Sequence, residues 1–550
     1  MHFIYKFLKE KCIYNIIFLL IILVQVLIII HYGNRKITLF IDEIWTFNLA
    51  NSYYAPFIGD ASNYFNKWLN ASFWQSSIAV SADHQFCYSS VFYNQAQDVH
   101  PPLYYIIINT ICSFFPGQFS KWFGIVPNIL FFIIIQMVLY TTAKKIFDHK
   151  WSALLVCLFY GFSWGNINNI IFIRMYTLLT LFSILSFYYH LKLINEYNIK
   201  NLMLGLLCVL LGILTQYYFL IYQFFMSLFF VITLIKKKEY QKIVEYCVGY
   251  SAIFISIFIM FPASIHQIFS KSGYRGQEAF YNLKNTHFID RIAEFSHVIN
   301  FDLFGNYLKL ILILLIIILF IHFILTFYNI KVEKTAVRYK YLMKFTVKQP
   351  VIPINITDNT LIIAMAIITS LGYFSIVSKI APYYTTRYLV IIYPLISLIF
   401  MYLYNIILNI NKKSKIFFFI LFIALCCANT YNANNIVGNN LNFYNVQKQI
   451  KQDSIYIVLN QDETWWPTAQ NIITMTSVDN SYLLAEKRIE DLQDIKNVNN
   501  EFYKKHYAFI HKSSPCKITD TEFIQVLEKM KFQNIKILDK YNGTLFYVEW

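Results

Sequence analysis

Charged side chains are scarce in this chain of 550 residues: only 14% of its residues are Asp, Glu, Lys or Arg, whereas 57% are hydrophobic. Ordinary soluble domains contain about 25% charged residues. This scarcity excludes an ordinary soluble globular protein. We expect a mainly α, polytopic membrane protein, because apolar runs that recur at about 20 residues are typical of membrane-spanning helices.

Acidic residues are the rarer of the two charged kinds, with 30 Asp and Glu against 46 Lys and Arg and a net charge of +16. A basic balance can indicate nucleic-acid binding. Here, however, the Lys and Arg residues gather in short loops between apolar segments, which indicates membrane topology. We therefore expect no nucleic-acid partner. The nine cysteines are scattered, without a C-x-x-C pair or a Cys/His spacing typical of zinc sites.

Apolar runs close to the length of a membrane span recur along the chain. They lie near residues 13–31, 122–143, 151–169, 171–191, 201–218, 219–235, 243–262, 308–328, 359–378, 388–409 and 415–429. The stretch 103–115 is apolar but short for a span, and is more typical of a re-entrant or interfacial segment. We expect eleven spans, or thirteen if this stretch and one further short helix cross.

Basic clusters predict the orientation of these spans. Lys6, Lys9 and Lys11 precede the first run, and no small-residue cleavage site follows it, so we expect an uncleaved anchor with a cytoplasmic N-terminus. The later clusters, such as Lys236 to Lys238, then fall on the same inner side. The loop 32–102 and the C-terminal tail are expected on the outer side of a plasma or bacterial inner membrane.

The tail differs in character from the rest of the chain. We expect residues 1–430 to form the membrane domain, with its outer loop 32–102, and residues 431–550 to form a soluble extracytoplasmic α/β domain. Short strands are predicted at 454–459, 471–476 and 507–511, and a hairpin around Asn542-Gly543 joins 535–539 to 545–550. Thr519 and Glu522 have capping-box spacing before a helix that reaches Met530.

Two acidic motifs stand in the first outer loop. The first is Asp42-Glu43, about a dozen residues beyond the first span. A carboxylate at the water-lipid boundary can take a proton from an acceptor hydroxyl when the leaving group is good, while its neighbour holds a nearby helix. The alternative is a helix start, at which acidic residues interact favourably with the helix dipole.

The second motif is Asp98-Val99-His100-Pro101-Pro102-Leu103, at the end of the same loop. Its paired prolines predict an extended segment and a helix that begins directly after them. His100 is suited to contact a phosphate or ligate a metal, and the alternative is a loop histidine that satisfies a backbone group. Asp98 and His100 are residue types that hold divalent metal ions, but no third ligand is evident, so we assign neither a metal site nor a cofactor.

Together the two motifs resemble those of the protein O-mannosyltransferase type of glycosyltransferase family 39, within the membrane-embedded GT-C class. Three further segments resemble landmarks of the bacterial members: Arg174-Met175-Tyr176, Thr215-Gln216-Tyr217-Tyr218 and Arg387-Tyr388. The second of these often has His in place of Gln216. The resemblance covers most of residues 38–390.

The resemblance implies a hexosyl- or pentosyltransferase that moves a sugar, with inversion, from a polyprenyl-phosphate donor. The acceptor is an unidentified extracytoplasmic protein, lipid or glycan, and membrane lipid surrounds the enzyme. By this resemblance Asp42 is the catalytic base, and Glu43 and Asp98 support the acceptor or the geometry of the active site.

The same resemblance and the placement of cations suggest how the donor is held. Arg174 and Arg387 lie at expected outer helix ends, where a guanidinium can pair with phosphate through two hydrogen bonds. The alternative is that these side chains extend to the membrane interface. The remaining candidates are His100 and Lys379 for the donor phosphate, and Tyr176, Tyr217 and Tyr218 for lining the substrate site.

Two other classes of function compete with this one. A transporter or flippase for a lipid-linked saccharide should carry polar residues near mid-membrane and related half repeats. In this sequence the distinctive charges gather at outer helix ends, and no repeat is evident. The other rival is a glycan ligase or oligosaccharyltransferase of the same fold.

Overall fold

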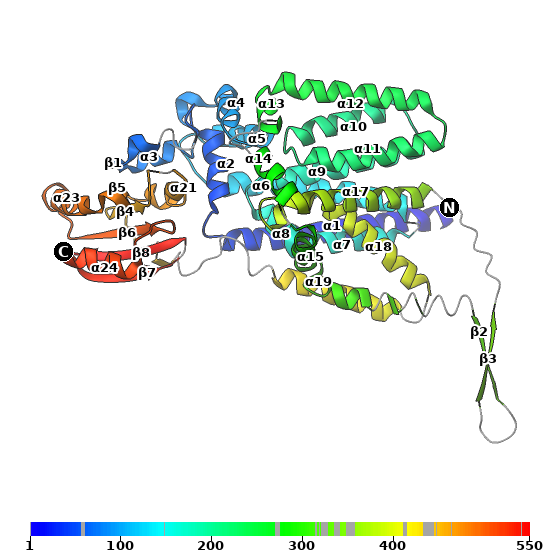
Figure 1. Ribbon diagram of the computed structural model, residues 1–550. Helices are drawn as coiled ribbons and strands as arrows, with labels where there is room; N and C mark the ends of the chain where they lie inside the picture. The colour runs from blue at the N-terminus through cyan, green and yellow to red at the C-terminus, as the bar shows by residue number, and fades with distance from the viewer. Residues whose placement is uncertain are drawn as a thin grey trace.

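The structure, a computed structural model, describes residues 2–56, 61–147, 149–269, 275–285, 287–313, 316–317, 320, 328–334, 341–347, 358–410, 415–432, 445–446, 448–463, 465–540 and 542–550. A bundle of long helices forms one end of the molecule, and a sheet with short helices forms the other (Figure 1). The helices of the first outer loop lie between them.

Six helices of the described residues are long and apolar enough to cross a membrane. They are α1 (His2–Arg35), α6 (Trp122–Ile146), α9 (Tyr176–Asn195), α11 (Phe219–Lys236), α12 (Tyr240–Met260) and α17 (Asp358–Ile380). Helices α7 (Lys150–Gly161) and α8 (Trp164–Ile171) meet at a 59° bend and together would make a seventh span. Four shorter apolar helices are α5 (Leu103–Ser113), α10 (Ile199–Ile213), α18 (Tyr393–Ile410) and α19 (Lys415–Asn432).

These helices confirm a mainly helical, polytopic membrane protein. The expected span at 151–169 is the bent pair α7 and α8, because Ser163 has extended backbone and its hydroxyl donates to the carbonyl of Tyr160. The expected spans at 201–218, 388–409 and 415–429 correspond to the shorter helices, and the one at 308–328 lies partly outside the described residues. Segment 103–115 forms only the 11 residues of α5.

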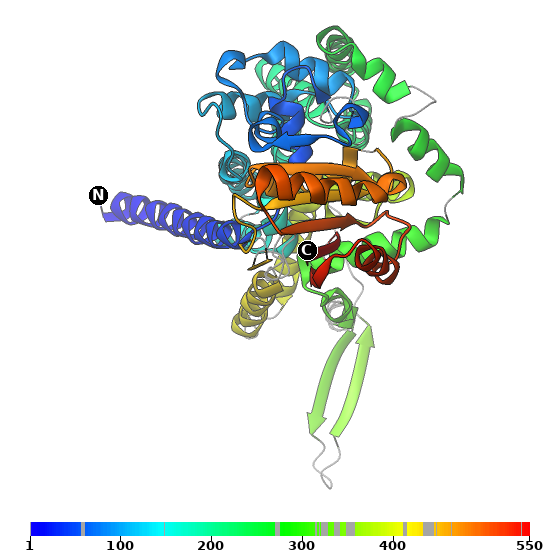
Figure 2. The same ribbon diagram turned by 90° about the vertical axis from the view of Figure 1, so that its left-hand side faces the viewer.

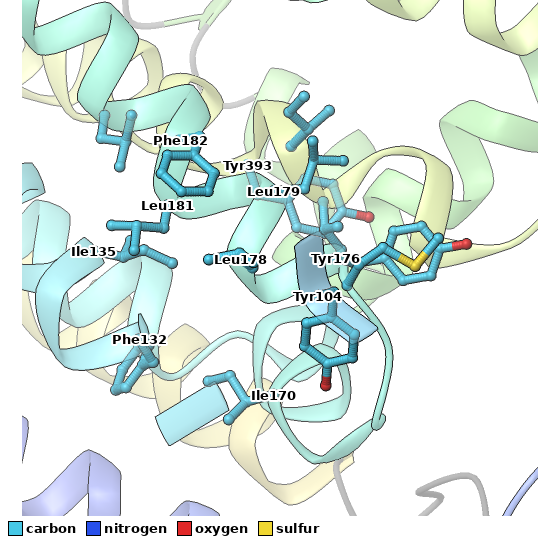
Figure 3. Close-up of a cluster of buried hydrophobic side chains, with 14 of the residues drawn as sticks. Tyr104, Phe132, Ile135, Ile170, Tyr176, Leu178, Leu179, Leu181, Phe182 and Tyr393 are labelled. Carbon is cyan, nitrogen blue, oxygen red and sulfur yellow. The ribbon is translucent and has the colours of Figure 1, made fainter. Parts of the chain in front are cut away.

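Helix α9 lies at the centre of the bundle and packs against α6, α10 and α11. Figure 3 shows the cluster around it, with Phe132 and Ile135 of α6 facing Leu178 and Leu181 of α9. Tyr176 and Tyr393 belong to the same cluster, and both also have roles at the site below. Close packing on all sides of one helix gives the outer loops a rigid support.

The outer segments consist of short helices. The first loop contains α2 (Ile41–Asn51), η2 (Ala61–Tyr64), α3 (Ala71–Ser76), η3 (Ala82–His84) and α4 (Tyr88–Ala96). Buried amide side chains join them: Asn48 donates to the carbonyl of Ser77 and Asn94 donates to that of Ser52, both at 2.8 Å. Later outer elements are α13 (Ala263–Phe269), α14 (Arg275–Asn285), α15 (Phe288–Phe304), η4 (Thr386–Tyr388) and η5 (Val390–Ile392).

The C-terminal sheet has six strands in the order β1-β5-β4-β6-β8-β7. Five come from the tail: β4 (Ile455–Asn460), β5 (Asn480–Ala485), β6 (Tyr507–Ser513), β7 (Gln533–Asp539) and β8 (Gly543–Glu549). The sixth, β1 (Trp68–Asn70), comes from the first outer loop and pairs antiparallel with β5. The indole of Trp74 also donates to the hydroxyl of Ser481, at 2.7 Å. The outer loop and the tail therefore share one sheet, which faces the viewer in Figure 2.

Most of the local predictions for the tail are confirmed. Strands β4 and β6, the hairpin at Asn542-Gly543 and the capping box of α24 (Asp520–Lys529) lie where the sequence predicts. The strand predicted at 471–476 is wrong, because this segment forms the helical turn α22 (Ile472–Met475). Ile472 and Met475 are both buried, three residues apart, and a short apolar run does not by itself distinguish helix from strand.

The remaining elements of the tail are short. They are α21 (Trp465–Ala469), η8 (Glu486–Asp491), α23 (Leu492–Val498) and η9 (Asn499–Tyr503). In the basic segment before α17, strands β2 (Tyr328–Lys334) and β3 (Tyr341–Val347) form an antiparallel hairpin. The hairpin and the N-terminus both lie at the end of the molecule away from the C-terminal sheet (Figure 1).

Candidate active site

A cavity of about 590 Å³ opens where the helix bundle, the first outer loop and the tail meet. Eight of the residues predicted from the sequence line it together: Asp42, Asp98, His100, Arg174, Tyr176, Tyr217, Tyr218 and Arg387. They come from segments spread over more than 340 positions of the chain. The fold therefore gathers most of the predicted site into one place.

Asp42 lies in the first turn of α2, so the Asp-Glu pair does begin a helix. Its carboxylate also faces the cavity and forms an ion pair with the guanidinium of Arg387. The exposed fractions of the two side chains are 15% and 17%, so the pair is partly screened from water but reachable from the cavity. Asp42 therefore both begins a helix and presents its carboxylate to the cavity.

Arg174 is buried in the turn between α8 and α9, beneath Asp42. Its Nη1 donates to the backbone oxygen of Asp42 at 3.1 Å, to the hydroxyl of Thr46 at 3.2 Å and to that of Tyr105 at 3.1 Å. Burial lowers the pKa of this guanidinium, but Tyr105 and Asp42 raise it more, and the net shift is upward. Arg174 therefore stays charged and supports the start of α2.

Arg387 lies on η4, between the rings of Tyr383 and Tyr388, at 5.6 and 5.2 Å from their centroids. Burial lowers its pKa, whereas Tyr176, Tyr388 and Asp42 raise it, again with a net upward shift. Among the described residues, no acceptor binds the buried Nε–H of either Arg387 or Arg174. A buried donor without a partner costs free energy, which an anion entering the cavity would recover.

A chain of polar contacts holds the second motif against α13 and the turn between α10 and α11. The hydroxyl of Tyr217 donates to the side-chain oxygen of Gln267 at 2.6 Å, and the amide of Gln267 donates to the backbone oxygen of Asp98 at 2.7 Å. Gln216 contacts Nδ1 of His100 at 3.4 Å. Gln216, where relatives often have His, therefore supports the Asp98 to His100 segment.

Glu43 and Lys379 do not line this cavity. Glu43 is buried, pairs with the ammonium of Lys36 at 2.7 Å and accepts from the backbone N–H of Phe40 and Ile173 at 2.7 and 2.8 Å. It ties α2 to the turn that carries Arg174. Lys379 lies near the end of α17, next to the lining residue Ile380.

Several lining residues had not been predicted as site residues. Trp466 and Gln470 reach the cavity from the tail, on and just after α21, and Gln267 reaches it from α13. Trp466 keeps 38% of its surface exposed at the cavity. Two adjacent tryptophans at the end of the polar sequence Asp462 to Trp466 are the sequence feature that could have indicated a binding residue here.

The site has no evident place for a metal ion. No group of three or more His, Cys, Asp and Glu side chains gathers within the described part of the chain. Asp98 and His100 share the cavity wall, but the remaining carboxylate there, that of Asp42, is paired with Arg387.

Comparison with known proteins agrees with the motifs. A family described as dolichyl-phosphate-mannose-protein mannosyltransferase matches residues 99–266, which include five of the eight predicted residues in the cavity: His100, Arg174, Tyr176, Tyr217 and Tyr218. The chain resembles the GT-C membrane glycosyltransferases. No curated protein matches the sequence.

Two solved structures are similar over nearly the whole chain. One is ArnT from Cupriavidus metallidurans bound to undecaprenyl phosphate, with 12% identity, a TM-score of 0.43 and coverage of 96% of this chain and 97% of that one. The other is the apo state of the same protein, with 11% identity, a TM-score of 0.40 and coverage of 92% and 95%.

Proposed function

We propose that the chain transfers a sugar from a polyprenyl-phosphate donor to the hydroxyl of an acceptor on the outer side of the cell membrane. The observation that carries the proposal is two arginines, the buried Arg174 and the partly buried Arg387, each with a buried Nε–H that no described acceptor binds, beside the carboxylate of Asp42. Two fixed cations suit a phosphate, and the adjacent carboxylate suits a proton acceptor.

The walls of the cavity suit such a donor. Apolar side chains at its membrane side, Leu220, Ile221 and Ile380, can contact the first isoprene units, while the polar end offers Arg174 and Arg387 to the phosphate. Tyr176, Tyr217 and Tyr218 also line the cavity and can contact the sugar. Arg387 is already paired with Asp42, so the donor phosphate would compete with that carboxylate.

The competition suggests an order of events. When the phosphate takes over Arg387, the Asp42 carboxylate is released and can accept the proton of the acceptor hydroxyl. The hydroxyl oxygen then bonds to C1 of the sugar as the bond from C1 to the phosphate oxygen breaks, and polyprenyl phosphate leaves. A single displacement of this kind inverts the configuration at C1. The arginines stabilise the charge that grows on the leaving phosphate.

The proposal is tested with purified protein, a lipid extract that contains polyprenyl-phosphate sugars, and envelope material as the acceptor. We expect mass spectrometry to detect free polyprenyl phosphate and a glycosylated product, both absent from the Asp42→Asn variant. A glycan ligase would instead release polyprenyl diphosphate after transferring a whole saccharide. A flippase in vesicles would move the intact lipid-linked sugar across the bilayer without releasing polyprenyl phosphate, and that result would overturn the proposal.

A further inference from the structure

A second buried carboxylate lies behind the cavity. Asp302, in the last turn of α15, has only 1% of its surface exposed. Among the described residues no Lys, Arg or His forms an ion pair with it, and both of its oxygens instead accept hydroxyl groups. The hydroxyl of Thr386 donates to Oδ1 at 3.2 Å, and the hydroxyl of Tyr393 donates to Oδ2.

These two hydroxyls bracket Arg387 in the sequence. Thr386 precedes Arg387 on η4, and Tyr393 begins α18 after the short η5. One carboxylate therefore fastens both ends of the segment that presents Arg387 to the cavity. A third tether acts between them, since the hydroxyl of Tyr373 on α17 donates to the backbone oxygen of Tyr388 at 2.7 Å.

Helix α8 closes the space behind Asp302. A Cβ atom added at Gly165 would lie 2.6 Å from Cβ and 2.8 Å from Cγ of Asp302, closer than real contacts allow. Glycine at position 165 thus permits α8 to pack directly on this side chain. The packing of α8 restricts the side chain of Asp302, and the segment that carries Arg387 is hydrogen-bonded to this restricted side chain.

Burying a carboxylate costs more free energy than burying a neutral side chain, so a purely structural contact would not need one. Burial raises the pKa of Asp302 to about 7, although the hydroxyls of Tyr393 and Thr386 partly oppose the rise. A neutral amide would lose less solvation free energy on burial. However, Thr386 and Tyr393 donate to different oxygens of Asp302, and an amide would present an NH₂ donor at one of these two positions.

We infer that Asp302 is a positioning residue that sets the guanidinium of Arg387 for the donor phosphate. The inference rests on the proposed function, and it adds a residue that does not line the substrate cavity itself. Asp302 acts through Thr386 and Tyr393, which hold η4 in place. A guanidinium that pairs through two hydrogen bonds depends on such placement more than a point charge does.

The test is a double-mutant cycle on the binding of undecaprenyl phosphate to the purified full-length protein in detergent. We expect Asp302→Asn to weaken binding about tenfold, the equivalent of one hydrogen bond to a charged group. In the Arg387→Gln background the same change should have no further effect, because coupled residues are not additive. Asp290→Asn is the matched control, since Asp290 is exposed on the first turn of the same helix.

Each outcome separates the inference from the proposed function. Equal weakening in both backgrounds would show a general structural effect and overturn the positioning role, as would unchanged binding in Asp302→Asn. If Arg387→Gln itself left binding unchanged, Arg387 would not bind the donor phosphate. That result would contradict both the proposed phosphate site and the positioning role of Asp302. Tyr393→Phe and Thr386→Val each remove one tether, and they repeat the test if Asp302→Asn does not accumulate.

Discussion

The carboxylate of Asp42 and the guanidinium of Arg387, 345 positions apart in the chain, form an ion pair at the wall of the cavity. Each of the two groups is needed elsewhere in the proposed reaction, the first for the acceptor proton and the second for the donor phosphate. While they are paired, neither is available. In the proposed reaction, this pair would keep Asp42 occupied until a donor arrives.

Asp42→Asn should abolish transfer without weakening donor binding. Loss of a general base costs about 10²- to 10⁴-fold in rate, while removal of the competing carboxylate should make undecaprenyl phosphate bind more tightly to Arg387. Transfer rates and binding constants measured on the same preparation check both parts. The control is Asp83→Asn, an exposed change in the same outer loop. Transfer at the wild-type rate would make Asp98 the next candidate base.

Arg387→Lys should weaken the binding of undecaprenyl phosphate about tenfold while the protein still accumulates in the membrane. Lysine keeps the charge, and with it a partner for Asp42, but it lacks the planar fork that binds two phosphate oxygens. Titration of the purified variant measures the effect, with Arg488→Lys, at an exposed position of the tail, as the control. Unchanged affinity and kinetics would indicate that Arg387 merely extends to the membrane interface.

Trp466→Ala should impair the use of the acceptor more than that of the donor. Trp466 approaches the cavity from the tail, opposite the membrane helices that would hold the prenyl chain. We expect at least a tenfold loss in transfer with undecaprenyl phosphate binding unchanged, and recovery in Trp466→Phe, which keeps an aromatic face. A parallel loss of phosphate binding would instead place Trp466 at the donor.

The shared sheet allows a direct test of topology. Because β1 of the first loop pairs with β5 of the tail, both segments must lie on one side of the membrane. Single cysteines at Asn63 and Glu528, both exposed, should react with an impermeant maleimide in intact cells, whereas one at Lys237 should not. The natural cysteines are first replaced. Labelling at Lys237 but at neither of the other positions would reverse the expected orientation.

Local chemistry explains which parts of the molecule could be predicted. The helix after Pro102, the capping box at Thr519 and the turn at Asn542-Gly543 each depend on neighbours a few residues away. The eight predicted residues that line the cavity could be named from the sequence because their motifs resemble those of a known family. The ion pair between Asp42 and Arg387 could not be predicted in this way, because it depends on how α2 packs against distant segments.

Long-range contacts explain what was missed. Strand β1 has only three residues, and nothing near Leu69 indicates its partner Ser481, 412 positions later. Asp302 follows Phe301 in a helix with no motif, and its role appears only when Thr386 and Tyr393 fold against it. The approach of α21 to the cavity likewise depends on how the tail docks, which local propensity does not determine.

The pairing of β1 with β5 also has a consequence for how the protein is made. The ribosome finishes Leu69 412 residues before Ser481, a gap of about 20 to 80 seconds at about 5–20 residues per second. During that time the exported loop has no strand to pair with, and the wall that Trp466 and Gln470 supply does not yet exist. The membrane helices can insert in order, but the chamber that these walls enclose is complete only once the tail has folded. Premature termination would therefore leave an inserted protein without a finished chamber.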